Sequence, residues 1–144
     1  MRVTFFGHRQ VLEEIEDVLT ETIEELIVHQ NADVFYVGHQ GDFDSSVRQT
    51  LKRLQKIYPR ISYTVVLAYM PSIGKPLFEE DVPTLYPDAL EKVPYRFAIS
   101  YRNQWMIEHS DVVVSYVTHS IGGAAMFTEK AKKKGKRIVR LNVK

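Results

Sequence analysis

The chain alternates between blocks of two hydrophobic periodicities, one typical of strands and the other of helices. From Val11 to Ile27, apolar residues recur every three or four positions and acidic residues occupy the other face, which predicts an amphipathic helix. Short runs of β-branched and aromatic residues lie on both sides of it, at 2–6 and 34–37. The same criteria predict strands at 61–68, 111–116 and 137–141, and helices at 42–58, 95–109 and 122–135.

This order of elements predicts an α/β fold. Strands that alternate with helices form right-handed βαβ crossovers, which place helices on both faces of a parallel sheet. We therefore expect a single Rossmann-like domain over 1–144, a three-layer sandwich with a mainly parallel sheet of about five strands. The segment 70–94 holds five of the six prolines and no sustained periodicity, so we expect a long loop with a short helix near 88–92. Such a loop is either a plain connection or a functional segment.

Composition narrows the classes of protein that the chain can represent. The 144 residues include 19 basic and 18 acidic side chains, which leaves a net charge of +1 and no overall basic field for nucleic acid. The absence of cysteine excludes disulfides, zinc sites built on thiolates and a cysteine nucleophile. No apolar stretch suits a signal peptide or a membrane span, so we expect a cytoplasmic protein without membrane contact.

Candidate chemistry gathers in three loops that follow predicted strands, at 7–10, 38–44 and 118–123. Open parallel sheets bind ligands beyond the carboxyl ends of their strands, so these loops should share one edge. Their glycines let backbone N–H groups approach an anion, and the helix N-termini that follow favour phosphate. Arg9 would bind phosphate, and Asp42 and Asp44 would accept hydrogen bonds from ribose hydroxyls, although Asp44 also suits a helix cap. Neither a P-loop nor G-x-G-x-x-G occurs, so an ordinary dinucleotide or P-loop site is not predicted.

Arg102 is the charged residue whose position is most informative. It lies at the apolar stripe of the helix predicted at 95–109, where an unpaired charge is costly. The side chain therefore pairs with a carboxylate such as Asp111, extends its charged end to solvent, or reaches the ligand. The basic run from Lys130 to Arg137, by contrast, is typical of a solvated helix end and lacks the interleaved aromatic residues of a nucleic-acid patch.

Three histidines, His8, His39 and His119, fall in the three strand-end loops. They would either form a metal site with Asp42 or act as hydrogen-bond donors and acid–base groups in a phosphate pocket. No compact metal motif such as H-E-x-x-H occurs, so we expect no metal.

Four short motifs, in order along the chain, resemble the SLOG superfamily, the SMF/DprA–LOG group of Rossmann-like proteins. They are Phe6-Gly7-His8-Arg9, the segment from Gly38 to Asp44, Arg102-Asn103-Gln104-Trp105-Met106 leading to Ser110-Asp111, and Gly122-Gly123-Ala124-Ala125 entering the last helix. The resemblance covers nearly the whole chain and is especially to small stand-alone bacterial YpsA-like members. It implies a nucleotide-derived ligand at the strand ends, held by the glycine loop before the last helix.

The resemblance and the strand-end chemistry together define one set of candidate ligand-binding residues. These are Gly7, His8, Arg9, Gly38, Gly41, Asp42, Asp44, Arg102, Asn103, His119, Gly122 and Gly123. We expect a sensor or binding protein for a nucleotide or nucleotide-derived sugar phosphate, with no separate cofactor. The acidic first helix and the basic last helix would also suit a homodimer or larger homo-oligomer.

The alternative function is that of an N-glycosidase. LOG enzymes are phosphoribohydrolases that cut the N-glycosidic bond of nucleoside monophosphates, and they carry P-G-G-x-G-T-x-x-E with a catalytic glutamate. When Ile121-Gly122-Gly123 is aligned with P-G-G, Ala125 and Met126 replace G-T, although Glu129 falls on the glutamate. This departure makes binding the first expectation. Glu129, with His8 as proton donor, is the catalytic candidate of the alternative.

Overall fold

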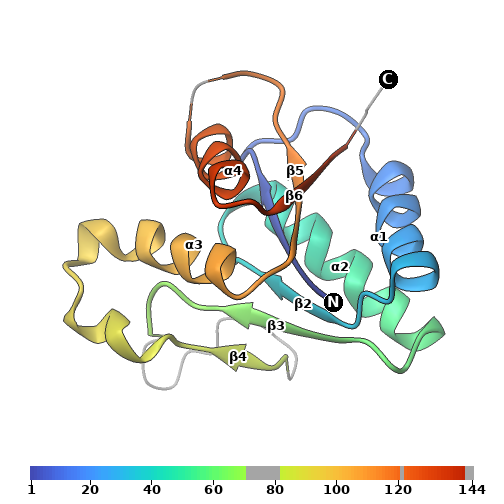
Figure 1. The fold of residues 1–144 in the computed structure, drawn as a ribbon, viewed down its shortest axis with the longest axis horizontal. Coiled ribbons are helices and arrows are strands. Elements are labelled where there is room, and N and C mark those ends of the chain that lie inside the picture. The colour runs from blue at the N-terminus through green and yellow to red at the C-terminus, as the bar shows by residue number, and fades with distance from the viewer. Residues whose placement is uncertain (71–81, 121, 142–144) are drawn as a thin grey trace.

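The computed structural model describes residues 1–70, 82–120 and 122–141, which form a parallel sheet covered by helices (Figure 1). Its strand order is β4-β3-β2-β1-β5-β6. The strands are β1 (Arg2–Gly7), β2 (Val34–Val37), β3 (Ser62–Val66), β4 (Thr84–Leu85), β5 (Val112–Tyr116) and β6 (Arg137–Arg140). The helices are α1 (Glu16–Gln30), α2 (Gly41–Ile57), α3 (Ala98–Glu108) and α4 (Gly123–Lys133), with 3-10 helices η1 (Asp88–Lys92) and η2 (Tyr95–Phe97).

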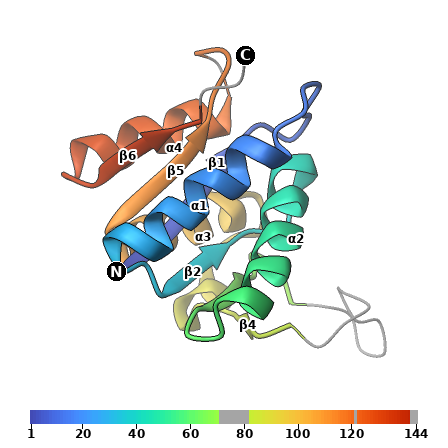
Figure 2. The same cartoon turned by 90° about the vertical axis from the view of Figure 1, so that its right-hand side faces the viewer.

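Alternate residues of β1 face the two helical layers. Val3 and Phe5 belong to the hydrophobic core beneath α1 and α2. Phe6 belongs to a second core with residues of α3 and α4, including Met106 and Phe127. Both views show the sheet between these two pairs of helices (Figure 2). The predicted three-layer Rossmann-like sandwich is therefore confirmed.

Two elements differ from the sequence prediction. β4 adds a sixth strand within the stretch predicted as the 70–94 loop, and it pairs in parallel with β3. α1 begins at Glu16 rather than near Val11, because the preceding residues form a loop in which Leu12 is 85% exposed. The short helix predicted near 88–92 is present as η1. Residues 71–81 of the predicted loop lie outside the described part of the chain.

The centre of the sheet contains a reversal of strand order. From β1 the chain proceeds outward through β2, β3 and β4, and it then returns to place β5 on the other side of β1. Gly7 pairs in register with Tyr116, so β1 and β5 end side by side. Such a switch point is where open α/β sheets bind ligands.

In the described ranges, none of the helices combines the length and the apolar character that crossing a bilayer demands.

Candidate functional site

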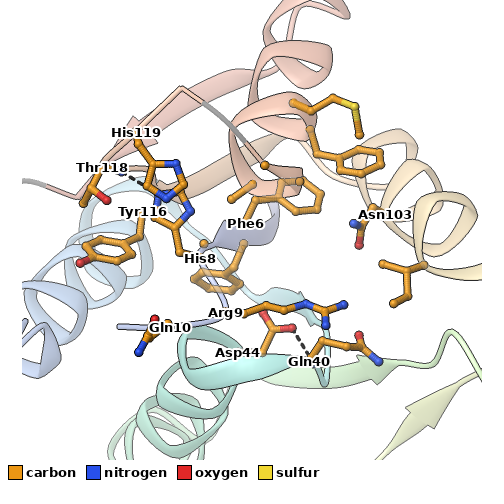
Figure 3. A pocket seen from close by; sticks show the side chains of 18 of the residues that line it. Phe6, His8, Arg9, Gln10, Gln40, Asp44, Asn103, Tyr116, Thr118 and His119 are labelled. Carbon is orange, nitrogen blue, oxygen red and sulfur yellow. Dashed lines mark hydrogen bonds between the residues drawn. The ribbon is translucent and has the colours of Figure 1, made fainter. Parts of the chain in front are cut away.

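A cavity of about 640 Å³ opens at this switch point, between α2, α3 and α4 (Figure 3). One part of its wall is polar and the other is apolar. The polar and small residues are Gly7, His8, Arg9, Gln10, Glu13, Gln40, Asp44, Ser100, Arg102, Asn103, Tyr116, Thr118, His119, Gly122, Gly123 and Ala124. The apolar residues are Phe5, Phe6, Leu12, Ile99, Met106, Met126 and Phe127. The loops after β1, β2 and β5 thus meet at one edge, as the parallel sheet requires.

The N-terminus of α4 lies in the cavity wall with its backbone donors unused by side chains of the described residues. Gly122 has φ +109°, a backbone conformation that favours glycine, and it serves as the N-cap without a side-chain hydrogen bond. The first turn of α4 contains no acidic residue. A Cβ atom added at Gly123 would meet no heavy atom within 4 Å. The positive end of this helix is therefore open to an anion.

The N-terminus of α2 lies at the same edge but is already compensated by its own carboxylates. Asp42 and Asp44 stand in its first turn, and the Asp44 side chain accepts a hydrogen bond from the backbone N–H of Gln40 at 3.0 Å. This bond satisfies one of the backbone donors at the start of the helix. Of the two helix ends, the one at α4 is consequently the better anion site.

Arg102 reaches from α3 into the interior and is 2% exposed. Its guanidinium donates hydrogen bonds to the Val66 carbonyl at 3.0 Å and to Gln40 Oε1 at 2.7 Å, and Nε donates to Asn103 Oδ1 at 2.8 Å. Burial lowers the pKa of Arg102 to about 10, and the nearby Asp44 carboxylate acts against this shift. Asp111, the predicted partner, instead accepts a hydrogen bond from the backbone N–H of Arg2. Arg102 therefore joins α3 to the ends of β3 and β2 and also lines the cavity.

Asp44 is the buried carboxylate of the cavity, with 9% of its surface exposed. Burial raises its pKa, while the bond from Gln40 and the charges of nearby arginines oppose that rise. Gly38 makes this packing feasible, because a Cβ there would lie 2.6 Å from Asp44 Oδ2 and 3.0 Å from Arg102 Nη1. Gly38 thus leaves room for the Asp44 and Arg102 side chains and is not part of the cavity wall.

Arg9 extends across the cavity toward Gln40 and Asn103 (Figure 3). Its side chain is exposed, and within the described residues its guanidinium has no ion pair or hydrogen bond. Arg9 therefore contributes a positive charge that is available to a ligand.

His8 and His119 stack on each other at the rim of the cavity, with ring centroids 3.9 Å apart and an interplanar angle of 9°. His8 follows β1 and His119 follows β5, so the stack bridges the two strands at the switch point. His8 Nε2 accepts a hydrogen bond from the Thr118 backbone N–H at 2.8 Å, which assigns the ring proton of neutral His8 to Nδ1. Burial, and then the charge of His119, lower the pKa of His8.

The loop between β1 and α1 is fastened over the cavity at three points. Asp42 N–H donates to the Arg9 carbonyl at 2.7 Å, and Val11 N–H donates to Asp42 Oδ2 at 3.1 Å. The Tyr116 hydroxyl donates to Glu13 at 3.0 Å. Gly41, with φ +85°, lets the start of α2 approach the backbone of Arg9. Asp42 and Gly41 thus hold this loop and do not line the cavity.

His39 stands apart from the other two histidines of the predicted trio. Its Nε2 is 3.3 Å from the Ala68 backbone N–H, which donates to it. Burial lowers its pKa to about 4, with a further contribution from the charges of Arg102 and Arg48. The three-histidine arrangement is therefore not formed. In the part of the chain that the structure describes, no group of three or more His, Asp or Glu side chains could hold a metal ion.

The catalytic candidate Glu129 lies outside this cavity. It lines a neighbouring hollow of about 980 Å³ on another side of α4, together with Lys130, Lys133 and Arg140. His119 and Gly122 border both spaces. Ile121, which the motif alignment includes, lies outside the described residues.

Most of the predicted ligand-binding residues are thus brought together, and the sequence reasoning also missed several. Among the predicted set, Gly7, His8, Arg9, Asp44, Arg102, Asn103, His119, Gly122 and Gly123 line the cavity. Glu13 was missed because the helical periodicity continues through it, and Gln40 because no charge marked it within its loop. Tyr116 is the last residue of a strand beside the loops, and that position was a usable signal.

The arrangement defines a class of fold, the Rossmann-like α/β proteins with a ligand cavity at the switch point. No protein-family model matches the chain, and no curated protein matches it. Among solved structures, the chain is similar to DNA processing protein A (DprA) from Streptococcus pneumoniae, with a TM-score of 0.71 and 17% sequence identity. The similarity covers 96% of this chain and 49% of that one, so the chain spans about half the length of its structural neighbour. This likeness supports the DprA-like fold that the motifs predicted, while the YpsA-like subgroup stays a prediction.

Proposed function

We propose that the protein binds a nucleotide or nucleotide-derived sugar phosphate in the cavity between α2, α3 and α4, with the phosphate at the N-terminus of α4. The observation that carries this proposal is the end of α4 in the cavity wall, which has no side-chain cap. Arg9 lines the same cavity, and within the described residues its guanidinium has no ion pair or hydrogen bond. Backbone donors, a helix dipole and an arginine together form a site for phosphate.

The remaining wall suits the other parts of such a ligand. The Asp44 carboxylate accepts the Gln40 N–H through Oδ2, and its two oxygens offer further lone pairs for hydrogen bonds from sugar hydroxyls. Ile99, Met106 and Met126 provide an apolar surface against which a base can pack. A volume of about 640 Å³ lies within the range of small-molecule sites.

Binding is favoured over N-glycoside hydrolysis by the position of Glu129. Hydrolysis requires a carboxylate beside the anomeric carbon, and Glu129 faces the neighbouring hollow instead of the cavity wall. Release of free base from nucleoside monophosphates, lost in Glu129→Gln, would establish the hydrolase in place of this proposal.

The experiment exploits the open space at Gly123. Gly123→Asp adds a carboxylate at the proposed phosphate position without a steric clash, and Gly123→Asn adds a neutral side chain of the same shape. Calorimetric titration would use nucleoside monophosphates, sugar phosphates and a short single-stranded oligodeoxynucleotide. We expect a nucleotide or sugar phosphate to bind wild type and Gly123→Asn, and its affinity to fall at least tenfold in Gly123→Asp.

The stability of the same variants provides the control. An acidic residue near a helix N-terminus stabilises the helix by roughly 0.3–1 kcal/mol, so Gly123→Asp should unfold no more easily than Gly123→Asn. Equal binding by both variants, or no binding by the wild-type protein to any phosphate in the panel, would refute the proposal.

A further inference from the structure

The stacked pair His8–His119 has a feature that phosphate binding alone does not use, namely two imidazoles in contact at the rim of an anion site. The His119 ring is exposed and lies beside the N-cap of α4, with its Cε1 3.9 Å from where a Gly122 Cβ would be. His8 is fixed behind it, because its Nε2 accepts the Thr118 N–H.

We infer that His119 takes up one proton when a phosphate monoester binds, so that the site selects the dianionic monoester over a phosphodiester. This inference rests on the proposed function. His8 stays neutral as the platform for the charged ring, since a proton on its Nε2 would break the bond from Thr118. A cation is stabilised over the face of an aromatic ring.

The charges around the pair account for a single added proton. Arg9 follows His8 in the chain, Arg102 faces the same cavity from α3, and two protonated rings in a stack would repel each other. Two carboxylates line the same cavity: Glu13 accepts the Tyr116 hydroxyl, and Asp44 accepts the Gln40 N–H. A hydrogen bond from a neutral donor leaves the charge of a carboxylate in place, so both also favour a proton on His119. From α4, His119 faces the backbone donors of the first turn on the cavity side. On its other side it borders the hollow that Glu129, Lys130 and Lys133 of α4 and Arg140 of β6 line, and the excess of positive charge there acts against a second proton on the pair.

The charge of the ligand then selects between phosphate esters. Arg9 and the α4 N-terminus can balance the single charge of a phosphodiester. A monoester carries a second charge above its second pKa of about 6, and the His119 proton balances it. We expect this proton to be taken from solvent when the monoester binds at pH 8.

The coupling of proton uptake to ligand binding predicts how affinity changes with pH. Above pH 7 the free phosphate is mostly deprotonated, and the inferred complex holds one proton more than its separated partners. Affinity should therefore increase as the pH falls from 8 to 6.5, by up to about tenfold per pH unit. The increase should end near pH 6, where the free phosphate itself is protonated. Affinity should fall at lower pH, once both free partners carry a proton, because binding then releases one.

The test is titration calorimetry with adenosine 5′-monophosphate, or with whichever nucleoside monophosphate binds tightest, and with its phosphate methyl ester. Measurement at pH 7.8 in two buffers of different ionisation enthalpy counts the protons taken up. We expect close to one proton for the monoester, markedly fewer for the methyl ester, and at least fivefold weaker binding of the ester at pH 6.5.

Two variants distinguish proton uptake by His119 from a purely structural role of its ring. His119→Phe preserves a stacking ring without a titratable nitrogen, and it should bind the monoester with no proton uptake and a flat pH profile. His29→Gln, at an exposed histidine at the end of α1, should behave as wild type. Binding of the monoester without proton uptake, or unchanged uptake in His119→Phe, would overturn this inference while leaving the proposed function intact. Absence of any nucleotide binding would instead remove the proposed function itself.

Discussion

Arg102 is the most deeply buried charged side chain of the described residues. Its structural role is to connect segments that are distant in the sequence. Its guanidinium binds the carbonyl at the end of β3 and the amide of Gln40 before α2. Both acceptors would be left without this donor in a truncated variant, and a buried unsatisfied polar group costs about 1–3 kcal/mol.

Arg102→Ala should therefore lower the free energy of unfolding by roughly 3 kcal/mol, because it removes these bonds and leaves a cavity. Urea denaturation measures this change. Arg96→Ala removes an exposed arginine that packs on Phe97 in the same region, and it should cost less than about 1 kcal/mol. Equal effects of the two substitutions would contradict the structural role of Arg102.

His39 gives the molecule an acid-sensitive residue that does not itself line the cavity. Its pKa in the folded protein is about 4, mainly through burial, whereas an unfolded histidine titrates near 6.5. The unfolded chain therefore binds more protons between these values, and stability should fall as the pH decreases from 6.5 to 4. The loss attributable to His39 is on the order of 2 kcal/mol after allowance for the partial exposure of its ring.

The measurement compares urea denaturation of wild type and His39→Gln at pH 7.5 and pH 4.5. Glutamine keeps an acceptor for the Ala68 N–H but does not titrate, so the variant should lose less stability on acidification. Asp44, whose pKa is raised by burial, contributes to both proteins and cancels in the comparison. Parallel losses in the two proteins would show that His39 is not the acid-sensitive group.

At the residue scale, the sequence predicts which side chains matter better than it predicts where they point and what they contact. The sequence placed Arg102 at the apolar stripe of its helix, and its side chain is 2% exposed. The partners of the charge were not predictable, because they are a backbone carbonyl and an amide from distant segments. Asp42 and Asp44 are two positions apart in one helix, yet one binds the loop before α1 and the other faces the cavity. Helical phase, fixed only by tertiary packing, decides between them.

Among the elements, the loop from His8 to Ile15 is held in part by side-chain hydrogen bonds. The Tyr116 hydroxyl holds Glu13 at the cavity, while the ring of Tyr116 stacks on Phe43 in the core. Tyr116→Phe should preserve that stacking and release the loop. We expect faster amide hydrogen exchange over residues 9–15, weaker ligand binding, and a loss of global stability below about 1 kcal/mol.

Tyr58→Phe is the matched control, since its hydroxyl donates to Glu24 at 2.7 Å away from the cavity. This variant should leave both the exchange of residues 9–15 and ligand affinity unchanged. Unaltered exchange in Tyr116→Phe would mean that the backbone bonds to Asp42 suffice to order the loop.

The elements themselves were largely predictable, with two instructive exceptions. Buried parallel strands such as β5 are continuous apolar runs, which composition reveals directly. β4 is two residues long and lies between prolines, so no periodicity could mark it. The start of α1 was misplaced because Val11 and Leu12 continue the helical spacing, although the backbone there is bound to α2. Tertiary hydrogen bonds, and not local propensity, therefore determine that α1 begins at Glu16.

For the whole molecule, the parallel sheet is what made the site predictable. Once all strands run in one direction, the loops that follow them must share an edge, whatever their lengths. The sequence therefore predicts which loops meet. It does not predict that Glu129 lies on another side of α4, because this depends on how the helix is rotated against the sheet.

Ligand binding at this edge should stabilise the entire fold, because the walls of the cavity come from both helical layers. A ligand at 100 times its dissociation constant stabilises the folded state by about 2.7 kcal/mol, which corresponds to a rise in melting temperature of roughly 5–10 °C for a domain of this size. Differential scanning calorimetry with the nucleotide identified by titration checks this. Gly123→Asp should show no such rise at the same concentration, and a full rise there would contradict the phosphate position.

The pairing of β1 with β5 also determines when the cavity can be completed during synthesis of the chain. β1 is the first strand made, yet its neighbour β5 and the glycines of α4 follow more than a hundred residues later. A ribosome-bound chain that ends before Gly123 lacks one wall of the cavity, however well its earlier strands have paired. If the proposed function holds, the nascent polypeptide gains its ligand site late, and retention on an immobilised nucleotide would report that synthesis has passed α4.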